Sequence, residues 1–117
     1  MSQASHTIYK QLVPLEKKYK YYKRSGPGGI RDDVYQSMIL HYKYDFLKKK
    51  LEYLLVSKRD NYMERLWTST SSIYLSDEGE KLIEYKLNND TELIQLKRTI
   101  IILKIQLKKK GYKPEYL

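Results

Sequence analysis

The chain has 117 residues, which is enough for one compact domain and too few for two. It contains no cysteine, so disulfides, thiolate nucleophiles and cysteine-based zinc sites are excluded. Lysine and arginine total 23 against 14 aspartate and glutamate residues, a net charge of +9. We therefore expect residues 1–117 to form a single, strongly basic domain.

Residues 1–7 lack the charged start and apolar run of a secretory signal, and no stretch approaches the roughly 18 apolar residues of a membrane span. Together with the absence of cysteine, this predicts a soluble, intracellular protein without a membrane span. We expect it in the cytoplasm or nucleoid, or in the interior of a virion.

The charge is distributed unevenly along the chain. Residues 1–31 and residues 97–117 each carry a net charge of +6, whereas residues 32–66 carry +1 and residues 67–96 carry −4. This pattern indicates an anionic partner for the two basic ends, or pairing of the ends with the acidic middle.

An amphipathic helix and a Gly-rich turn are predicted in the basic N-terminal segment, residues 1–31. Proline is favoured in a first helical turn but breaks helix interiors, so the helix either begins near Pro14 or kinks there. The run from Ser25 to Gly29 ends the helix in a turn. The apolar stripe steps by four and three residues through Ile8, Leu12, Leu15, Tyr19 and Tyr22.

The central segment, residues 32–67, is predicted to hold a long helix and a short one. Asp32 and Asp33 suit the first turn of a helix that ends near Val56, since their charge meets the helix dipole. Residues 57–61 are polar and predict a break, after which a short helix completes the segment. The long helix has a broad apolar face made by Ile39, Leu40, Tyr44, Phe46, Leu47, Leu51, Leu54 and Leu55.

A Ser/Thr-rich loop is expected over residues 68–76, and residues 77–117 then hold the C-terminal helices and a short tail. Ser76 suits the N-cap of the first of these helices. Residues 88–91 predict a break, and a second long helix follows from about residue 91 to residue 110. Its apolar stripe is Leu93, Leu96, Ile100, Leu103 and Leu107.

The predicted fold class is all-α, a small bundle of three to five helices with two long amphipathic helices near residues 32–56 and 91–110. A short strand near Ile73 to Leu75 is compatible with this reading. Residues 99–108 also alternate in a pattern typical of a strand, and that alternative stays open, although the heptad spacing and the end signals favour a helix.

A basic segment interleaved with tyrosines runs from Lys17 to Arg24. Lysine and arginine neutralise phosphates, and an exposed ring such as that of Tyr21 can stack on an unpaired base. This predicts a non-enzymatic protein that binds DNA or RNA independently of sequence. In the alternative interpretation, Tyr19 and Tyr22 belong to the core and the lysines form a solvated face. The candidate contacts are Lys17, Lys18, Lys20, Tyr21, Lys23, Arg24, Lys58, Arg59, Lys108, Lys109 and Lys110.

Two other patterns favour ordinary structure over a chemical site. The run from Gly26 to Gly29 lacks the Lys-Ser or Lys-Thr of a P-loop, so we favour an interhelical turn over a phosphate cradle. His41 and Asp45 lie one helical turn apart and favour a hydrogen bond or ion pair over a metal or catalytic site. No activated nucleophile is evident, and we expect no enzymatic activity, no cofactor and no metal.

The segment of residues 73–85 resembles the end of a winged-helix domain, where a wing strand with an aromatic residue leads through a Ser or Thr cap into a helix. The resemblance implies a DNA-binding regulator whose recognition helix would be residues 57–66. This chain departs from the family upstream, because residues 32–56 predict one long helix where the family needs two short ones. Tyr74, Leu75, Ser76, Gly79, Leu82 and Ile83 carry the likeness, and Lys58, Arg59, Asn61 and Arg65 would face DNA.

A third class of function is a helical accessory or structural subunit, for example one associated with a virion, or an inhibitor that acts on a protein. Thin amphipathic helices from a small chain bury too little apolar surface alone, which predicts a homo-oligomer or docking on a larger assembly. Such a subunit should bind a protein tightly and nucleic acid weakly.

Overall fold

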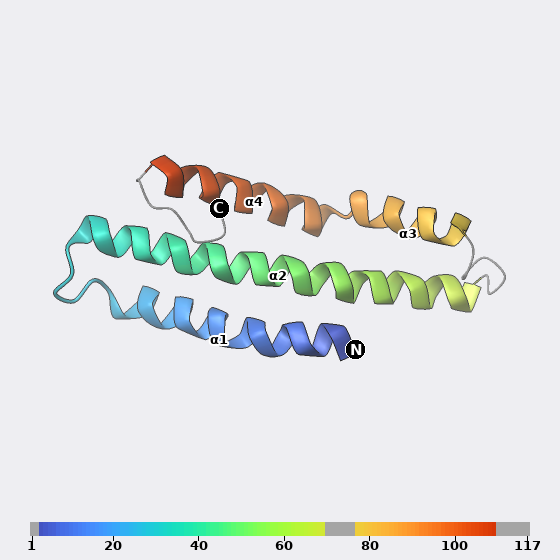
Figure 1. The fold of residues 1–117 in the computed structure, drawn as a ribbon, viewed down its shortest axis with the longest axis horizontal. Coiled ribbons are helices and arrows are strands. Elements are labelled where there is room, and N and C mark those ends of the chain that lie inside the picture. The colour runs from blue at the N-terminus through green and yellow to red at the C-terminus, as the bar shows by residue number, and fades with distance from the viewer. Residues whose placement is uncertain (1–2, 70–76, 110–117) are drawn as a thin grey trace.

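The computed structural model describes residues 3–69 and 77–109 (Figure 1). Over these residues the chain is helical and contains no strand, which confirms the all-α prediction. The residues of the suggested short strand, Ile73 to Leu75, lie outside the described ranges, as does Ser76. The four helices are α1 (Gln3–Ser25), α2 (Asp32–Ser69), α3 (Asp77–Asn88) and α4 (Thr91–Lys109).

Helix α1 runs through Pro14, so of the two predicted alternatives the one in which the helix begins near this proline is wrong. The helix ends where the Gly-rich turn was expected, and Gly26 and Gly28 have φ angles of 76° and 59°, in the left-handed region that favours glycine. The hydroxyl of Tyr35, on α2, donates a hydrogen bond of 2.9 Å to the carbonyl of Tyr22. This contact satisfies a free carbonyl in the last turns of α1 and fixes the turn against α2.

Helix α2 is continuous over 38 residues, so the predicted break at residues 57–61 is wrong. The polar side chains in this stretch continue the helix because they find partners on its neighbours on both sides. Lys58 and Arg59 form ion pairs with residues of the C-terminal helices, and Asp60 accepts a hydrogen bond of 3.3 Å from the hydroxyl of Ser5 on α1. A polar run in a shared central helix therefore makes contacts between helices.

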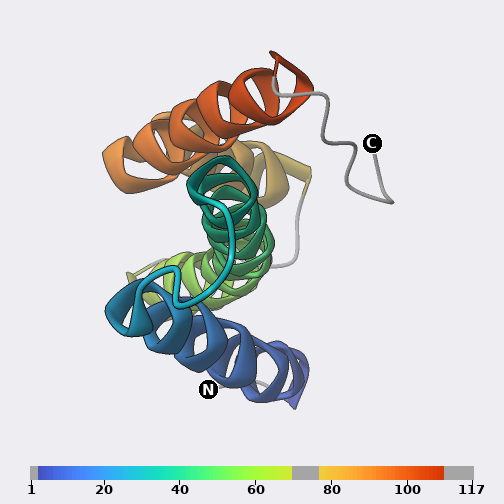
Figure 2. The same cartoon turned by 90° about the vertical axis from the view of Figure 1, so that its left-hand side faces the viewer.

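Helix α2 buries two opposite sides at once (Figure 2). Tyr42 and Phe46 meet rings of α1 at centroid distances of 5.2 and 6.0 Å. Tyr44 and Leu47 instead join Leu103 and Leu107 of α4 in a buried hydrophobic cluster. Residues two apart point to nearly opposite sides of an α-helix, so the broad face predicted from the sequence is divided between two partners.

The described residues form three layers, with α1 on one side of α2 and α3 followed by α4 on the other (Figure 1). Helix α1 touches neither α3 nor α4, and the molecule measures 61 × 26 × 22 Å. Its radius of gyration of 18.0 Å exceeds the ~13 Å of a compact domain of this size. No helix in the described ranges is long and apolar enough to cross a bilayer.

The break between α3 and α4 falls at Asn89 and Asp90, as predicted, and α4 then continues as a helix to Lys109. The strand alternative for residues 99–108 is wrong. Its alternating pattern has a different cause, because Leu103 is buried against α2 whereas Ile101 and Ile105 are exposed. A helix with apolar residues on two sides produces the alternation of a strand over a short stretch.

Replacing Pro14 with alanine should stabilise the protein. Proline has no N–H to bond the carbonyl of Lys10, and a proline inside a helix costs about 3 kcal/mol relative to alanine. We expect Pro14→Ala to raise the free energy of unfolding by roughly 1 to 3 kcal/mol in urea titrations. The exposed control Lys10→Ala should change it by less than about 0.5 kcal/mol. Destabilisation by Pro14→Ala would show that α1 depends on the shape the proline imposes.

Candidate nucleic-acid interface

The outer face of α1 is an exposed, basic stripe that carries one tyrosine. Lys10, Lys17, Tyr21 and Arg24 follow at steps of seven, four and three, which places them on the same side of the helix. All four are exposed, and the Tyr21 ring is 58% accessible. The buried residues Leu12 and Tyr19 occupy the opposite side, against α2. We call these four residues the α1 outer face.

The other predicted contacts on α1 flank this face and have intramolecular partners. The ammonium groups of Lys18 and Lys23 lie over the rings of Tyr42 and Tyr19, at 4.6 and 5.6 Å from the centroids. Lys20 forms an exposed ion pair of 2.6 Å with Glu16. Contacts of this kind at exposed sites are weak and hold the side chains without removing their charge from solvent.

The structure brings the two basic ends of the sequence to one end of the molecule (Figure 1). The last turns of α1 lie against residues 42–46 of α2, and the last turns of α4 pack on Tyr44 and Leu47 from the other side. Lys108 and Lys109 are exposed there, and Lys110 lies outside the described residues. The basic ends therefore share one end of the molecule on opposite sides of α2.

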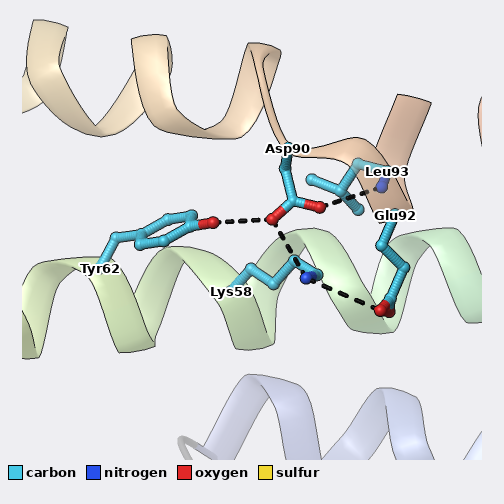
Figure 3. A network of polar contacts seen from close by, with 5 residues as sticks. All are labelled: Lys58, Tyr62, Asp90, Glu92 and Leu93. Carbon is cyan, nitrogen blue, oxygen red and sulfur yellow. Dashed lines mark hydrogen bonds and ion pairs between the residues drawn. The ribbon is translucent and has the colours of Figure 1, made fainter.

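Lys58 and Arg59 lie apart from that basic end, toward the middle of the molecule. Arg59 pairs with Glu80 of α3, and Lys58 pairs with Asp90 at 3.1 Å (Figure 3). Glu92 lies 3.9 Å from the same ammonium group. These two cations join α2 to the C-terminal helices, and a further contact of either one with nucleic acid stays a prediction.

Asp90 is the centre of this network, a role that its expected place in a helix break did not indicate. One carboxylate oxygen accepts a bond of 2.7 Å from the Tyr62 hydroxyl and faces Lys58, while the other accepts a bond of 3.1 Å from the N–H of Leu93 (Figure 3). Asp90 is thus the N-cap of α4. The Tyr62 hydroxyl above all, then the Leu93 N–H and Lys58, lower the pKa of Asp90 to about 2 despite its burial.

His41 and Asp45 form the expected pair, with Nε2 and Oδ2 at 3.1 Å. Burial raises the pKa of Asp45, and the charges of His41, Lys18 and Lys48 oppose that rise. Within the described ranges no three His, Asp or Glu side chains gather as metal ligands would. The ion pair that the sequence favoured is thus present within α2.

The Gly-rich segment is an interhelical turn, as predicted, closed by a hydrogen bond of 3.0 Å from the N–H of Ile30 to the carbonyl of Pro27. Beside the turn, the guanidinium of Arg31 donates two hydrogen bonds to the carboxylate of Asp33, of 2.6 and 3.1 Å. The cation near the turn therefore pairs with a carboxylate in the first turn of α2.

The winged-helix resemblance concerns residues of which only a part is described. Residues 77–85 are helical, whereas residues 73–76, with the suggested wing, lie outside the described ranges. Residues 57–66 continue α2 as part of one long helix. The resemblance stays a prediction.

Comparison of the chain with protein-family models, with curated proteins and with solved structures finds no match.

Replacing Asp90 with asparagine should destabilise the fold in a pH-dependent way. The folded-state pKa of about 2 is below the ordinary value of 3.8, so the ionised carboxylate stabilises the native state fully above about pH 5. This contribution is lost as pH falls toward 2. We expect Asp90→Asn to lower the free energy of unfolding by about 2 kcal/mol at pH 7, with a shrinking difference at low pH.

Urea titrations across pH measure this effect. The control Glu64→Gln removes an exposed carboxylate of α2 and should change stability by less than about 0.5 kcal/mol. A difference between the native protein and Asp90→Asn that is independent of pH would contradict the assignment of the stabilisation to the ionised carboxylate.

Proposed function

We propose that this protein binds nucleic acid independently of sequence, through the α1 outer face. The observation that carries the proposal is the alignment of Lys10, Lys17 and Arg24 around the exposed ring of Tyr21 on the side of α1 that faces away from the fold. Cations spaced along a helix neutralise successive phosphates and release counterions, and this supplies affinity without reading bases. Lys17 and Arg24 have no ion-pair partner among the described residues, so their charge is available to a ligand.

Tyr21 adds a stacking surface to this charge. Its ring packs at 83° to the ring of Tyr22, with a centroid distance of 5.2 Å, and the side chain is 58% exposed. An exposed ring among cations favours single strands, whose unpaired bases offer a face for stacking. The second basic end, on α4, lies at the same end of the molecule and extends the positive potential that attracts a polyanion.

The salt dependence of binding tests the role of the α1 outer face. The variant Lys17→Ala/Arg24→Ala removes two phosphate contacts, so the slope of log affinity against log salt should fall by about 0.7 to 0.9 per contact. Fluorescence anisotropy with DNA and RNA of unrelated sequence measures this slope. The variant should bind all sequences more weakly to a similar degree, because the lost contacts carry no sequence information.

The control Lys81→Ala/Lys86→Ala removes the same net charge from exposed positions on α3. It should leave the slope unchanged, because α3 belongs to the acidic part of the molecule. If both variants lower the salt slope equally, binding depends on net charge and not on the α1 outer face. If the native protein does not bind at moderate salt, the proposal is rejected.

Tyr21→Ala should weaken binding of single strands by about 1 to 3 kcal/mol, or roughly 5- to 150-fold, if the ring stacks on one base. Tyr21→Phe keeps the ring and should bind nearly as the native protein does. Tyr85→Ala, which removes an equally exposed ring from α3, serves as the matched control and should have no effect. Binding of duplex DNA should respond less to Tyr21→Ala than binding of single strands does, and equal losses for single and double strands would contradict stacking.

A second candidate function is that of a helical subunit that acts by protein contact. The exposed isoleucines of α4 favour it, because exposed apolar side chains that adjoin one another on a helix mark interaction surfaces. The two functions differ in their dependence on α1, since the affinity for a protein partner bound by α4 should not change in Lys17→Ala/Arg24→Ala.

A further inference from the structure

The outer side of the layer formed by α3 and α4 carries more apolar surface than a helix facing water normally does. Ile101, Ile102 and Ile105 are 57, 56 and 48% exposed, and they adjoin one another on the side of α4 opposite its buried leucines. Further along the same layer, Leu82 and Tyr85 of α3 are also exposed. We call these five residues the outer apolar set. A solvent-facing helix side is ordinarily polar, so this set indicates an interface.

The two halves of this layer carry opposite charges beside their apolar residues. Helix α3 has four acidic and two basic side chains, and its exposed carboxylates include Glu78 and Glu84. Helix α4 has one acidic and five basic side chains, among them Lys104 and Lys109. These four residues have no ion-pair partner in the part of the chain that the structure describes.

The spacing of these features is symmetric about Ile94, near the start of α4. Glu84 precedes Ile94 by ten residues and Lys104 follows it by ten, while Glu78 and Lys109 lie sixteen and fifteen residues away. Helices α3 and α4 follow one another along α2 (Figure 1), so distance in sequence translates into distance along the layer. A two-fold rotation near Ile94 would therefore place α3 of one copy on α4 of another.

We propose that two copies of this chain form an antiparallel dimer through the outer sides of α3 and α4. In this arrangement each Leu82 and Tyr85 meets the isoleucines of the partner, and each acidic α3 faces a basic α4. The contact is isologous, since the same patch serves on both copies and closes the assembly at two. A parallel arrangement would instead oppose the five cations of α4 to those of its copy, which like-charge repulsion disfavours.

The dimer is independent of the proposed nucleic-acid function and compatible with it. Helix α1 lies on the other side of α2 from this interface (Figure 2). Both α1 outer faces therefore remain exposed in the dimer, on its two opposite sides.

Sedimentation equilibrium of the full chain across a concentration series tests the proposal, and we expect a dimer at low salt. Ile101→Ser/Ile105→Ser should weaken dimerisation about tenfold or more, because it removes the apolar contacts of α4 with Leu82 and Tyr85 of the other copy. The control Ile30→Ser/Val34→Ser truncates two equally exposed apolar side chains near the turn before α2 and should leave the dimer intact. Circular dichroism checks that each variant stays helical. A native protein that is monomeric throughout the series overturns the proposal.

A charge exchange tests the antiparallel arrangement. Glu78→Lys/Glu84→Lys makes α3 basic, whereas Lys104→Glu/Lys109→Glu takes the net charge of α4 from +4 to zero and places carboxylates opposite the acidic α3 of the other copy. Each variant alone should therefore be monomeric or dimerise much more weakly, because like charges face one another at the exchanged positions. An equimolar mixture of the two should regain the dimer, since opposite charges then meet at both contacts. If the mixture stays monomeric while the native protein dimerises, the antiparallel contact of α3 with α4 is wrong.

Discussion

The whole structure depends on one constraint, that α2 must bury two opposite sides at once. Helix α1 touches α2 and no other helix, and the α3–α4 layer also has its main contacts with α2. Tyr42 and Phe46 serve one side while Tyr44 and Leu47 serve the other. An elongated arrangement of three layers follows, in which the two outer layers each keep one side free. Both proposed activities use those free sides, α1 for nucleic acid and α3 with α4 for a second copy.

Polar contacts set where the outer layers lie along α2, because apolar stripes with regular spacing permit several registers. The Tyr35 hydroxyl fixes the end of α1, and Asp60 meets Ser5 near its start. On the other side, Asp90 caps α4 and also binds Tyr62 and Lys58. Buried polar groups that are satisfied only in one arrangement specify it, since a shift by one turn would leave them unpaired. The register of α4 in turn brings its basic end beside that of α1.

The spacing and end signals of the sequence predicted the end of α1 and both ends of α4 closely. The spacing could not show that α2 has two partners, because one broad apolar face and two narrower opposite faces give similar patterns. The polar run at residues 57–61 predicts a break because its partners come from helices that are distant in sequence, and a local pattern does not show them. The α1 cations were found from composition, but the grouping of Lys17, Tyr21 and Arg24 depends on which side α2 covers. The sequence does not show that the isoleucines of α4 are exposed, because their pattern over residues 99–108 fits a helix and a strand.

We propose the α1 outer face as the surface that binds nucleic acid. Amide chemical-shift mapping by NMR, during titration of the native protein with a single-stranded oligonucleotide of unrelated sequence at low salt, tests it most directly. We expect shifts concentrated between Lys10 and Arg24, with smaller ones near Lys108 and Lys109, and none on α3. Shifts concentrated on α3, or no shifts at saturating oligonucleotide, would contradict the claim.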